Sequence, residues 1–189
     1  MAGNLENTKI RILDAAYGVF YKEGFTRARL DVIAAAACVT KRTLYYHFAS
    51  KDALLAAVLE AQHELALTRI DASICHSAGD PEAVLRTLFG DFAAWAGKPG
   101  WQGSGFTRAV VELADMPGHP ARAVARRHKA AIETRLAEKL GGPDIARQIM
   151  LLIEGCHSLI LIHNDPGYAQ AAAAAALVLV ERSTLLPAG

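Results

Sequence analysis

The stretch Thr40-Lys-Arg-Thr-Leu-Tyr-Tyr-His-Phe48 decides how this chain is expected to fold. Thr40 suits the N-cap of a helix over residues 41–47, because a threonine hydroxyl can accept a hydrogen bond from an amide of the first turn. Leu44 and Phe48 are four residues apart, so they share one face of that helix and predict that this face is buried. The opposite face is rich in cationic, hydroxyl and imidazole side chains. The stretch therefore predicts a short helix that presents polar groups to a partner.

A second short helix precedes this one, and only Ala37, Cys38 and Val39 separate the two. Leu30 and Ile33 give that helix an apolar face at helical spacing. Two short helices joined by a turn of three or four residues form a helix-turn-helix, which places its second helix in the DNA major groove. The alternative is an ordinary solvated face, because short helix-turn-helices also occur inside helical bundles.

Helical signals continue through the rest of the chain. Ile10, Leu13, Tyr17 and Phe20 predict one buried stripe of a first helix, which Gly24 is expected to end. Ser50 is expected to cap the helix that follows Phe48. Four later prolines each stand where a helix would begin, at 81, 120, 143 and 166, and Asp80 and Asp165 are good N-caps for two of these helices.

The whole pattern predicts an all-α chain of about nine helices without a sheet, because no segment alternates with a period of two residues. We expect a helix-turn-helix DNA-binding domain over residues 1–52. A larger helical region is expected over residues 53–189.

The net charge of the chain conceals an uneven distribution. Its 189 residues contain 20 Lys and Arg against 19 Asp and Glu, a formal charge of +1. Residues 22–51 contain six basic and two acidic groups, a net charge of +4, whereas residues 61–189 contain twelve basic and thirteen acidic groups, a net charge of −1. The positive charge therefore surrounds the predicted reading helix, as binding to a polyanion requires.

Composition excludes several other classes of protein. Apolar residues make up 52% and charged residues 21% of the chain, which excludes a disordered protein. Three cysteines, an odd number, imply no disulfide framework and favour a reducing compartment. The N-terminus resembles no signal peptide, and the apolar tract over residues 171–180 is too short to span a bilayer. We expect a cytoplasmic protein with no membrane partner and no cofactor.

Several segments of the first quarter of the chain resemble, in order and spacing, the N-terminal DNA-binding region of the TetR family of transcriptional repressors. The resemblance implies a homodimer that binds a palindromic double-stranded DNA operator and is released by a small-molecule effector. It also implies that the larger helical domain, over residues 53–189, serves ligand binding and dimerisation. It implies no enzymatic activity. The segments are Ile12-Leu-Asp-Ala-Ala-Tyr-Gly-Val-Phe20, Gly24-Phe25, Ile33-Ala34, Val39-Thr40 and Leu44-Tyr-Tyr-His-Phe-Ala-Ser-Lys-Asp-Ala-Leu54.

The resemblance also implies which side chains contact DNA. Lys41 and Arg42 are expected to read base edges, since arginine matches the O6 and N7 atoms of guanine. Lys51 corresponds to a family lysine that contacts a backbone phosphate. Mixed base and phosphate contacts are expected from Thr40, Thr43, Tyr45, Tyr46 and His47.

Two residues depart from the family pattern. Arg29 stands where threonine is usual, and it cannot cap a helix but can reach a phosphate with a full charge. Cys38 stands where glycine is usual, so either it accepts a conformation that glycine adopts without strain or the turn differs. Cys38 is a small filler side chain in the simplest interpretation, and a redox sensor only if its thiol is exposed and acidic.

The last two predicted helices are apolar on nearly every face, over residues 149–153, 159–162 and 177–180. A surface helix would have one apolar stripe, so these helices must be covered on more than one side. A four-helix interface between two subunits explains this pattern and suits a palindromic target. A monomer with two central helices is the alternative.

Large soft side chains concentrate in the middle of the chain, together with a few polar groups able to orient a ligand. Such a composition is typical of a pocket for a small, mostly apolar or aromatic effector, although the same residues can form core. The predicted ligand-binding residues are His63, Phe89, Phe92, Trp95, Trp101, Phe106, Arg108, Glu112, Met116 and His157.

A metalloenzyme is the alternative from a different class. Glu60 and His63, and likewise Glu154 and His157, have the Glu-x-x-His spacing of helical di-iron sites, which need two further glutamates such as Glu112 and Glu133. That hypothesis leaves the chemistry of residues 41–51 unexplained. A ligand-insensitive DNA-binding protein and an activator also stay open, and the sequence identifies neither effector nor operator.

Overall fold

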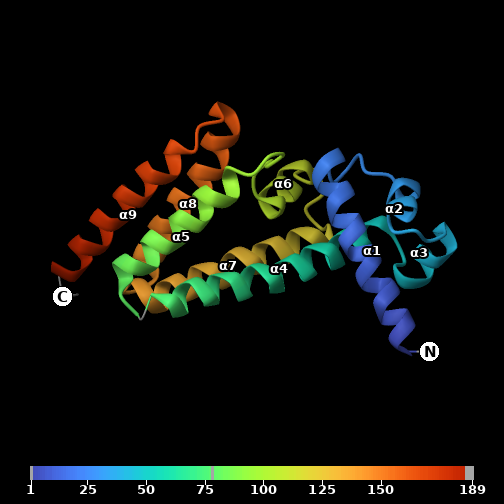
Figure 1. Cartoon of the computed structure of the whole chain (residues 1–189), viewed down its shortest axis with the longest axis horizontal. Coiled ribbons are helices and arrows are strands. Elements are labelled where there is room, and N and C mark those ends of the chain that lie inside the picture. The colour runs from blue at the N-terminus through green and yellow to red at the C-terminus, as the bar shows by residue number, and fades with distance from the viewer. Residues whose placement is uncertain (1, 78, 186–189) are drawn as a thin grey trace. The chain divides into compact units, whose positions relative to one another are not determined.

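The computed structural model describes residues 2–77 and 79–185 (Figure 1). These residues form nine α-helices and no strand, which confirms the predicted fold class. The helices are α1 (Ala2–Glu23), α2 (Leu30–Ala36), α3 (Lys41–His47), α4 (Lys51–His76), α5 (Pro81–Ala96), α6 (Gly105–Glu112), α7 (Pro120–Leu140), α8 (Pro143–His163) and α9 (Gly167–Leu185).

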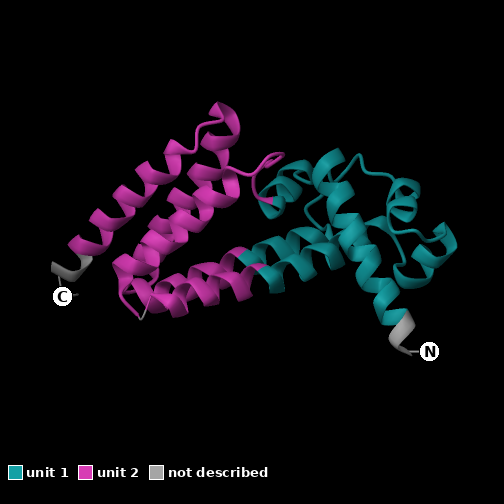
Figure 2. Ribbon diagram, viewed as in Figure 1, with its two compact units in different colours: residues 1–65, 105–128 teal, residues 66–104, 129–189 magenta. Residues whose placement is uncertain are grey.

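The chain divides into two compact units (Figure 2). Unit 1 comprises residues 1–65 and 105–128, and unit 2 comprises residues 66–104 and 129–189. Unit 1 therefore contains α1–α3, the first part of α4, α6 and the first part of α7. The boundary predicted after residue 52 lies inside unit 1, because α6 packs with the helix-turn-helix although it is distant in sequence.

The core of unit 1 is a continuous apolar cluster. In α1 the buried residues are Ile12, Ala16 and Phe20, which follow the i, i+4 row of the helix. This row turns Ile10 outward, with 51% of its surface exposed, so the prediction that Ile10 belongs to the buried stripe was wrong. Phe106 of α6 joins the same cluster.

Unit 2 is built around α5, α8 and α9, with α9 packed against both of the others. Leu85 of α5 and Ile149 of α8 are fully buried in its core. On α9 the buried positions are mostly alanines, such as Ala172 and Ala176. Small side chains at a helix contact permit a short distance between helix axes.

Several helix ends form as predicted. The Asp80 carboxylate accepts a hydrogen bond from the Glu82 amide at 3.1 Å at the start of α5. The Ser50 hydroxyl accepts one from the Ala53 amide at 3.0 Å at the start of α4. Gly24 follows the last residue of α1 with φ +100°, a conformation that few residues other than glycine adopt.

One helix within the described residues, α8, is long and apolar enough to cross a membrane by length and composition. Interior and interface helices of globular proteins have the same composition, so the apolar character of α8 is weak evidence for a membrane span.

Candidate nucleic-acid interface

The turn between α2 and α3 is a Schellman motif with cysteine in the position usual for glycine. The Val39 amide donates to the Ala34 carbonyl at 2.9 Å and the Cys38 amide donates to the Ala35 carbonyl at 3.0 Å. Cys38 has φ +52°, in the left-handed region. Of the two possibilities open at this position, cysteine therefore adopts the backbone conformation of glycine, at a steric cost.

The start and the inner face of α3 follow from its sequence. The Thr40 hydroxyl accepts a hydrogen bond from the Thr43 amide at 3.1 Å, so Thr40 is the predicted N-cap. Leu44 is fully buried and Phe48 is 5% exposed, and both belong to the core of unit 1. This packing fixes which face of α3 points outward.

The outward face of α3 presents the polar side chains predicted to contact DNA. Lys41 and Arg42 are exposed, Tyr45 is 53% exposed and Tyr46 is 72% exposed. His47 differs, because its Nε2 atom is buried and has no hydrogen-bond partner among the described residues. Four long polar side chains are therefore accessible, while His47 is turned partly inward.

Arg29 precedes α2 without capping it, as predicted. Its guanidinium instead forms an ion pair with Asp31, with Nη2 and Oδ2 at 2.6 Å. The hydrogen bond from Arg29 lowers the pKa of the Asp31 carboxyl. The side chain of Arg29 is 73% exposed, so it can still reach an anion outside the protein.

Lys51, the predicted phosphate ligand, is turned toward its own chain. Its ammonium group donates a hydrogen bond to the carbonyl oxygen of Thr26 in the turn between α1 and α2. Burial lowers the pKa of Lys51, whereas the nearby carboxylates of Asp52 and Glu112 oppose that shift. Thr26 was not among the predicted site residues, and its separation from Lys51 by 25 residues leaves no local sequence signal.

The predicted ligand-binding residues fall into both units. Those in unit 1 are His63, Phe106, Arg108, Glu112 and Met116. Those in unit 2 are Phe89, Phe92, Trp95, Trp101 and His157.

Within unit 1, four of these residues bind other parts of the protein. Arg108 and Glu112 hydrogen-bond to the end of α1 and the turn that follows it. His63 is buried, with its Nδ1 atom 3.1 Å from Nδ1 of His128, and Phe106 stacks on the His128 ring at a centroid distance of 3.6 Å. One of these two Nδ1 atoms must carry a proton and donate it to the other, so the rings of His63 and His128 share one hydrogen bond.

Within unit 2, four aromatic side chains form one cluster. His157 of α8 lies edge-on to Phe92 and Trp95, with ring centroids 4.8 and 5.8 Å away, and stacks on Trp101 at 6.5 Å. The Nε1 atom of Trp101 and the Nδ1 atom of His157 are buried without a hydrogen-bond partner among the described residues. We call these four residues the aromatic cluster. Phe89, by contrast, is 2% exposed in the apolar core.

Burial and the nearby Lys129 ammonium lower the pKa of His157 to about 4, against opposing effects of Glu154 and of the Ile153 backbone. The imidazole is therefore neutral at pH 7. Its Nδ1 atom is 3.8 Å from a Glu154 oxygen, and this pair is not ionic while His157 is neutral. The aromatic cluster thus contains an indole donor and a neutral imidazole whose Nε1 and Nδ1 atoms are both buried.

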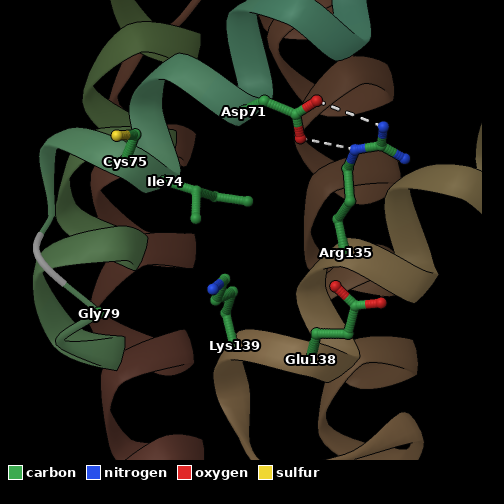
Figure 3. A pocket seen from close by; sticks show the side chains of 7 residues that line it. All are labelled: Asp71, Ile74, Cys75, Gly79, Arg135, Glu138 and Lys139. Carbon is green, nitrogen blue, oxygen red and sulfur yellow. Dashed lines mark hydrogen bonds and ion pairs between the residues drawn. The ribbon is translucent and has the colours of Figure 1, made fainter.

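A separate pocket of about 360 Å³ lies in unit 2 and contains none of the predicted residues (Figure 3). Four of its seven lining residues are charged, two of each sign. Asp71 and Arg135 form an ion pair across one side, with a distance of 2.6 Å between Oδ1 and Nε. The lining residues are Asp71, Ile74, Cys75, Gly79, Arg135, Glu138 and Lys139.

The two Glu-x-x-His pairs are part of other interactions. Glu60 forms an ion pair with Arg127, and Glu154 forms one with Lys129. Among the described residues no three His, Cys, Asp or Glu side chains are placed to hold a metal ion together. Cations of α7 therefore occupy the carboxylates that a di-iron site would use.

The short capped helix, its accessible polar face and the positive charge around it define a helix-turn-helix DNA-binding protein. The family model for bacterial regulatory proteins of the tetR family matches residues 12–58. The transcriptional repressor SCO4008 of Streptomyces coelicolor is 30% identical over 152 residues, which cover 74% of this chain and 73% of that protein. This chain belongs to the TetR family of transcriptional regulators.

Two further matches cover different shares of the chain. The repressor NicS of Pseudomonas putida is 38% identical over 87 residues, which are 46% of this chain and 41% of NicS. The matched region thus spans less than half of that relative. The crystal structure of SCO4454, a TetR-family regulator from Streptomyces coelicolor, superposes with a TM-score of 0.85 at 25% identity, covering 94% of this chain and 96% of that one.

Regulators of this family are soluble and bind DNA, and the matched proteins are regulators rather than enzymes. The metalloenzyme alternative is therefore not favoured.

Proposed function

We propose that this chain is a cytoplasmic repressor that binds a palindromic operator as a homodimer and is released by a small aromatic effector. The observation that carries the proposal is α3, in which Lys41, Arg42, Tyr45 and Tyr46 are accessible above a fully buried Leu44. Arginine and lysine can read guanine in the major groove, and tyrosine hydroxyls can reach phosphates. The net charge of +4 over residues 22–51 adds non-specific attraction.

The DNA-binding part is tested by selecting fragments of the source genome on the purified protein. The proposal predicts a shared sequence with two-fold symmetry among the selected fragments, because each subunit of a dimer reads one half-site. Selection of fragments without a common sequence would contradict it.

The dimer part rests on apolar side chains that α8 and α9 leave exposed. Leu151 is 69% exposed, Ile162 70% and Val178 51%. Exposed apolar surface of this kind marks an interface, and a second copy of the chain covers it symmetrically. Sedimentation of Leu151→Asp/Ile162→Asp should give a monomer where the unmodified chain gives a dimer, with Val111→Asp in α6, also 69% exposed, as a matched control. A dimeric double variant would reject this interface.

The effector part rests on the aromatic cluster. Buried polar atoms without partners cost about 1–3 kcal/mol each, so a ligand that pairs with Trp101 Nε1 and His157 Nδ1 recovers that cost. The chemistry favours a planar aromatic ligand that carries a hydrogen-bond acceptor. The chain has two tryptophans, Trp95 and Trp101, and both are in the cluster, so intrinsic fluorescence reports on this site.

We expect candidate effectors that release operator DNA to change the tryptophan emission, and His157→Phe to weaken both responses together. An effector that releases DNA without any change in emission would place the effector site elsewhere. If a compound releases operator DNA but neither fluorescence nor calorimetry detects its binding to the protein, the effector proposal itself is contradicted.

A further inference from the structure

Helix α6 contacts the DNA-binding helices through two side chains one turn apart, Arg108 and Glu112. Arg108 Nη1 donates to the carbonyl oxygen of Tyr21 at 3.0 Å, and its guanidinium lies over the rings of Tyr21 and Phe25 at 5.1 and 5.5 Å. The carbonyl of Tyr21 is in the last turn of α1, where helical carbonyls lack intrahelical partners. Arg108 therefore caps α1 from a helix that begins more than 80 residues later.

Thr26, in the turn after α1, is held on both sides by charged side chains. The Oε2 atom of Glu112 accepts hydrogen bonds from the Thr26 amide at 3.1 Å and from the Thr26 hydroxyl at 3.2 Å. The Lys51 ammonium group donates to the carbonyl oxygen of the same residue. All three hydrogen-bonding groups of Thr26 are thus used, two by α6 and one by α4.

This turn determines where the reading helix lies. It leads directly into α2, and its residues Phe25 and Ala28 are buried in the same core as Leu44 of α3. Gly24 approaches Glu112 so closely that an added Cβ would lie 3.2 Å from Oε2. A shift of the turn must therefore move α2 and α3 or open the core.

We propose that Glu112 and Lys51 form a brace on Thr26 that sets the position of the helix-turn-helix, with Lys51 acting in DNA binding as a positioning residue instead of a phosphate ligand. The inference rests on the proposed DNA-binding function. It assigns to Glu112 a role in operator affinity, although Glu112 is an anion in a protein that binds a polyanion.

The sign of the Glu112 effect provides the test. Loss of a negative charge by itself strengthens binding to DNA, whereas loss of the brace weakens it. Glu112→Ala should weaken operator binding about tenfold, and Glu112→Gln, which keeps an acceptor, should weaken it less. Asp115→Ala is the matched control, because it removes an exposed carboxylate just beyond α6. Equal or tighter binding by Glu112→Ala would overturn the proposal.

The salt dependence of binding separates the two possible roles of Lys51. A lysine that contacts phosphate contributes about 1 to the slope of log K against log salt, and its removal lowers the slope by that amount. The brace predicts that Lys51→Ala weakens binding with the slope unchanged, and that the Lys51→Ala/Glu112→Ala double variant is no weaker than the worse single variant. A slope reduced by about 1, with additive losses, would make Lys51 a phosphate ligand and contradict the brace.

A third variant, Thr26→Val, tests the brace without changing any charge and without unfolding the protein. It removes only the hydroxyl donor to Glu112, and we expect operator affinity about two- to threefold weaker at an unchanged salt slope. Unchanged affinity in Thr26→Val together with tighter binding in Glu112→Ala would reject the brace. Failure of the unmodified chain to bind any operator would instead reject the proposed function.

Discussion

Unit 1 and unit 2 are both helical, but they use their polar side chains differently. In unit 1 the charged groups of α4 and α6 bind backbone atoms, as Lys51 and Arg108 do at Thr26 and Tyr21. In unit 2 an aromatic cluster leaves the Trp101 indole and the His157 imidazole without partners among the described residues. The first arrangement fixes the turn before α2 in place. The second is the basis of the effector site proposed above.

The largest expected effect tests whether the cores of unit 1 and unit 2 serve different functions. Leu44 of unit 1 and Leu85 of unit 2 are both fully buried, so replacing either by alanine should cost about 2–5 kcal/mol of unfolding free energy. At a temperature where both variants stay folded, we expect only Leu44→Ala to lose operator affinity, measured by fluorescence anisotropy. Equal losses of affinity in the two variants would show that the position of the reading helix depends on both cores.

The burial of His157 predicts a pH-dependent stability that is specific to unit 2. Its pKa is about 4 in the folded chain, below its ordinary value of 6.5, so the unfolded chain binds more protons between these values. Stability should therefore fall as the pH decreases from 6.5 to 4, by roughly 3 kcal/mol at most from this group.

Denaturant titrations of the unmodified chain and of His157→Phe at several pH values measure this contribution. The difference in unfolding free energy between them should change over that range, whereas His163→Phe, at the exposed end of α8, controls for the substitution itself. A constant difference between pH 7 and pH 4 would contradict the neutral, buried imidazole.

Two arginine variants, one in α3 and one in α7, test whether the outward face of α3 reads bases. Arg42→Ala should cost about 1–3 kcal/mol of operator binding and relax the preference at one base pair. Arg126→Ala removes an exposed arginine of α7 and should weaken binding to all sequences slightly. Competition by single-base operator variants measures both. The assignment of Arg42 fails if both variants keep the same sequence preference.

The smallest predicted effect concerns the strained turn of unit 1. Cys38→Gly should raise the unfolding free energy by about 1 kcal/mol, because glycine adopts φ +52° without a Cβ clash. Calorimetry should then show a Tm increase of about 2–4 °C. Cys38→Ala keeps the strain and removes only the thiol, so an equal gain in that variant would attribute the effect to the sulfur.

Local signals predicted the outward face of α3 in unit 1 and several helix starts in both units. Thr40, Ser50 and Asp80 are capping residues whose partners lie two or three positions away, so the sequence contains both halves of each interaction. The outward face of α3 follows in the same way from the spacing of Leu44 and Phe48.

Long-range partners were not predictable. Thr26 and Glu112 are 86 residues apart, and His63 and His128 are 65 apart, so no periodicity connects them. Glu112 fits a ligand site by composition, and only the fold brings its carboxylate to Thr26. Similarly, Ile10 has the right spacing for a buried stripe, and the packing of neighbouring helices selected the row through Ile12 instead.

The most direct test of the central claim, that α3 reads a symmetric operator, is a footprint of the protein on a selected genomic fragment. We predict protection of two inverted half-sites whose centres are about 10–10.5 base pairs, or a multiple of that distance, apart. The Lys41→Ala/Arg42→Ala variant should lose this protection while remaining folded. A single asymmetric footprint, or one that the double variant leaves unchanged, would contradict the claim.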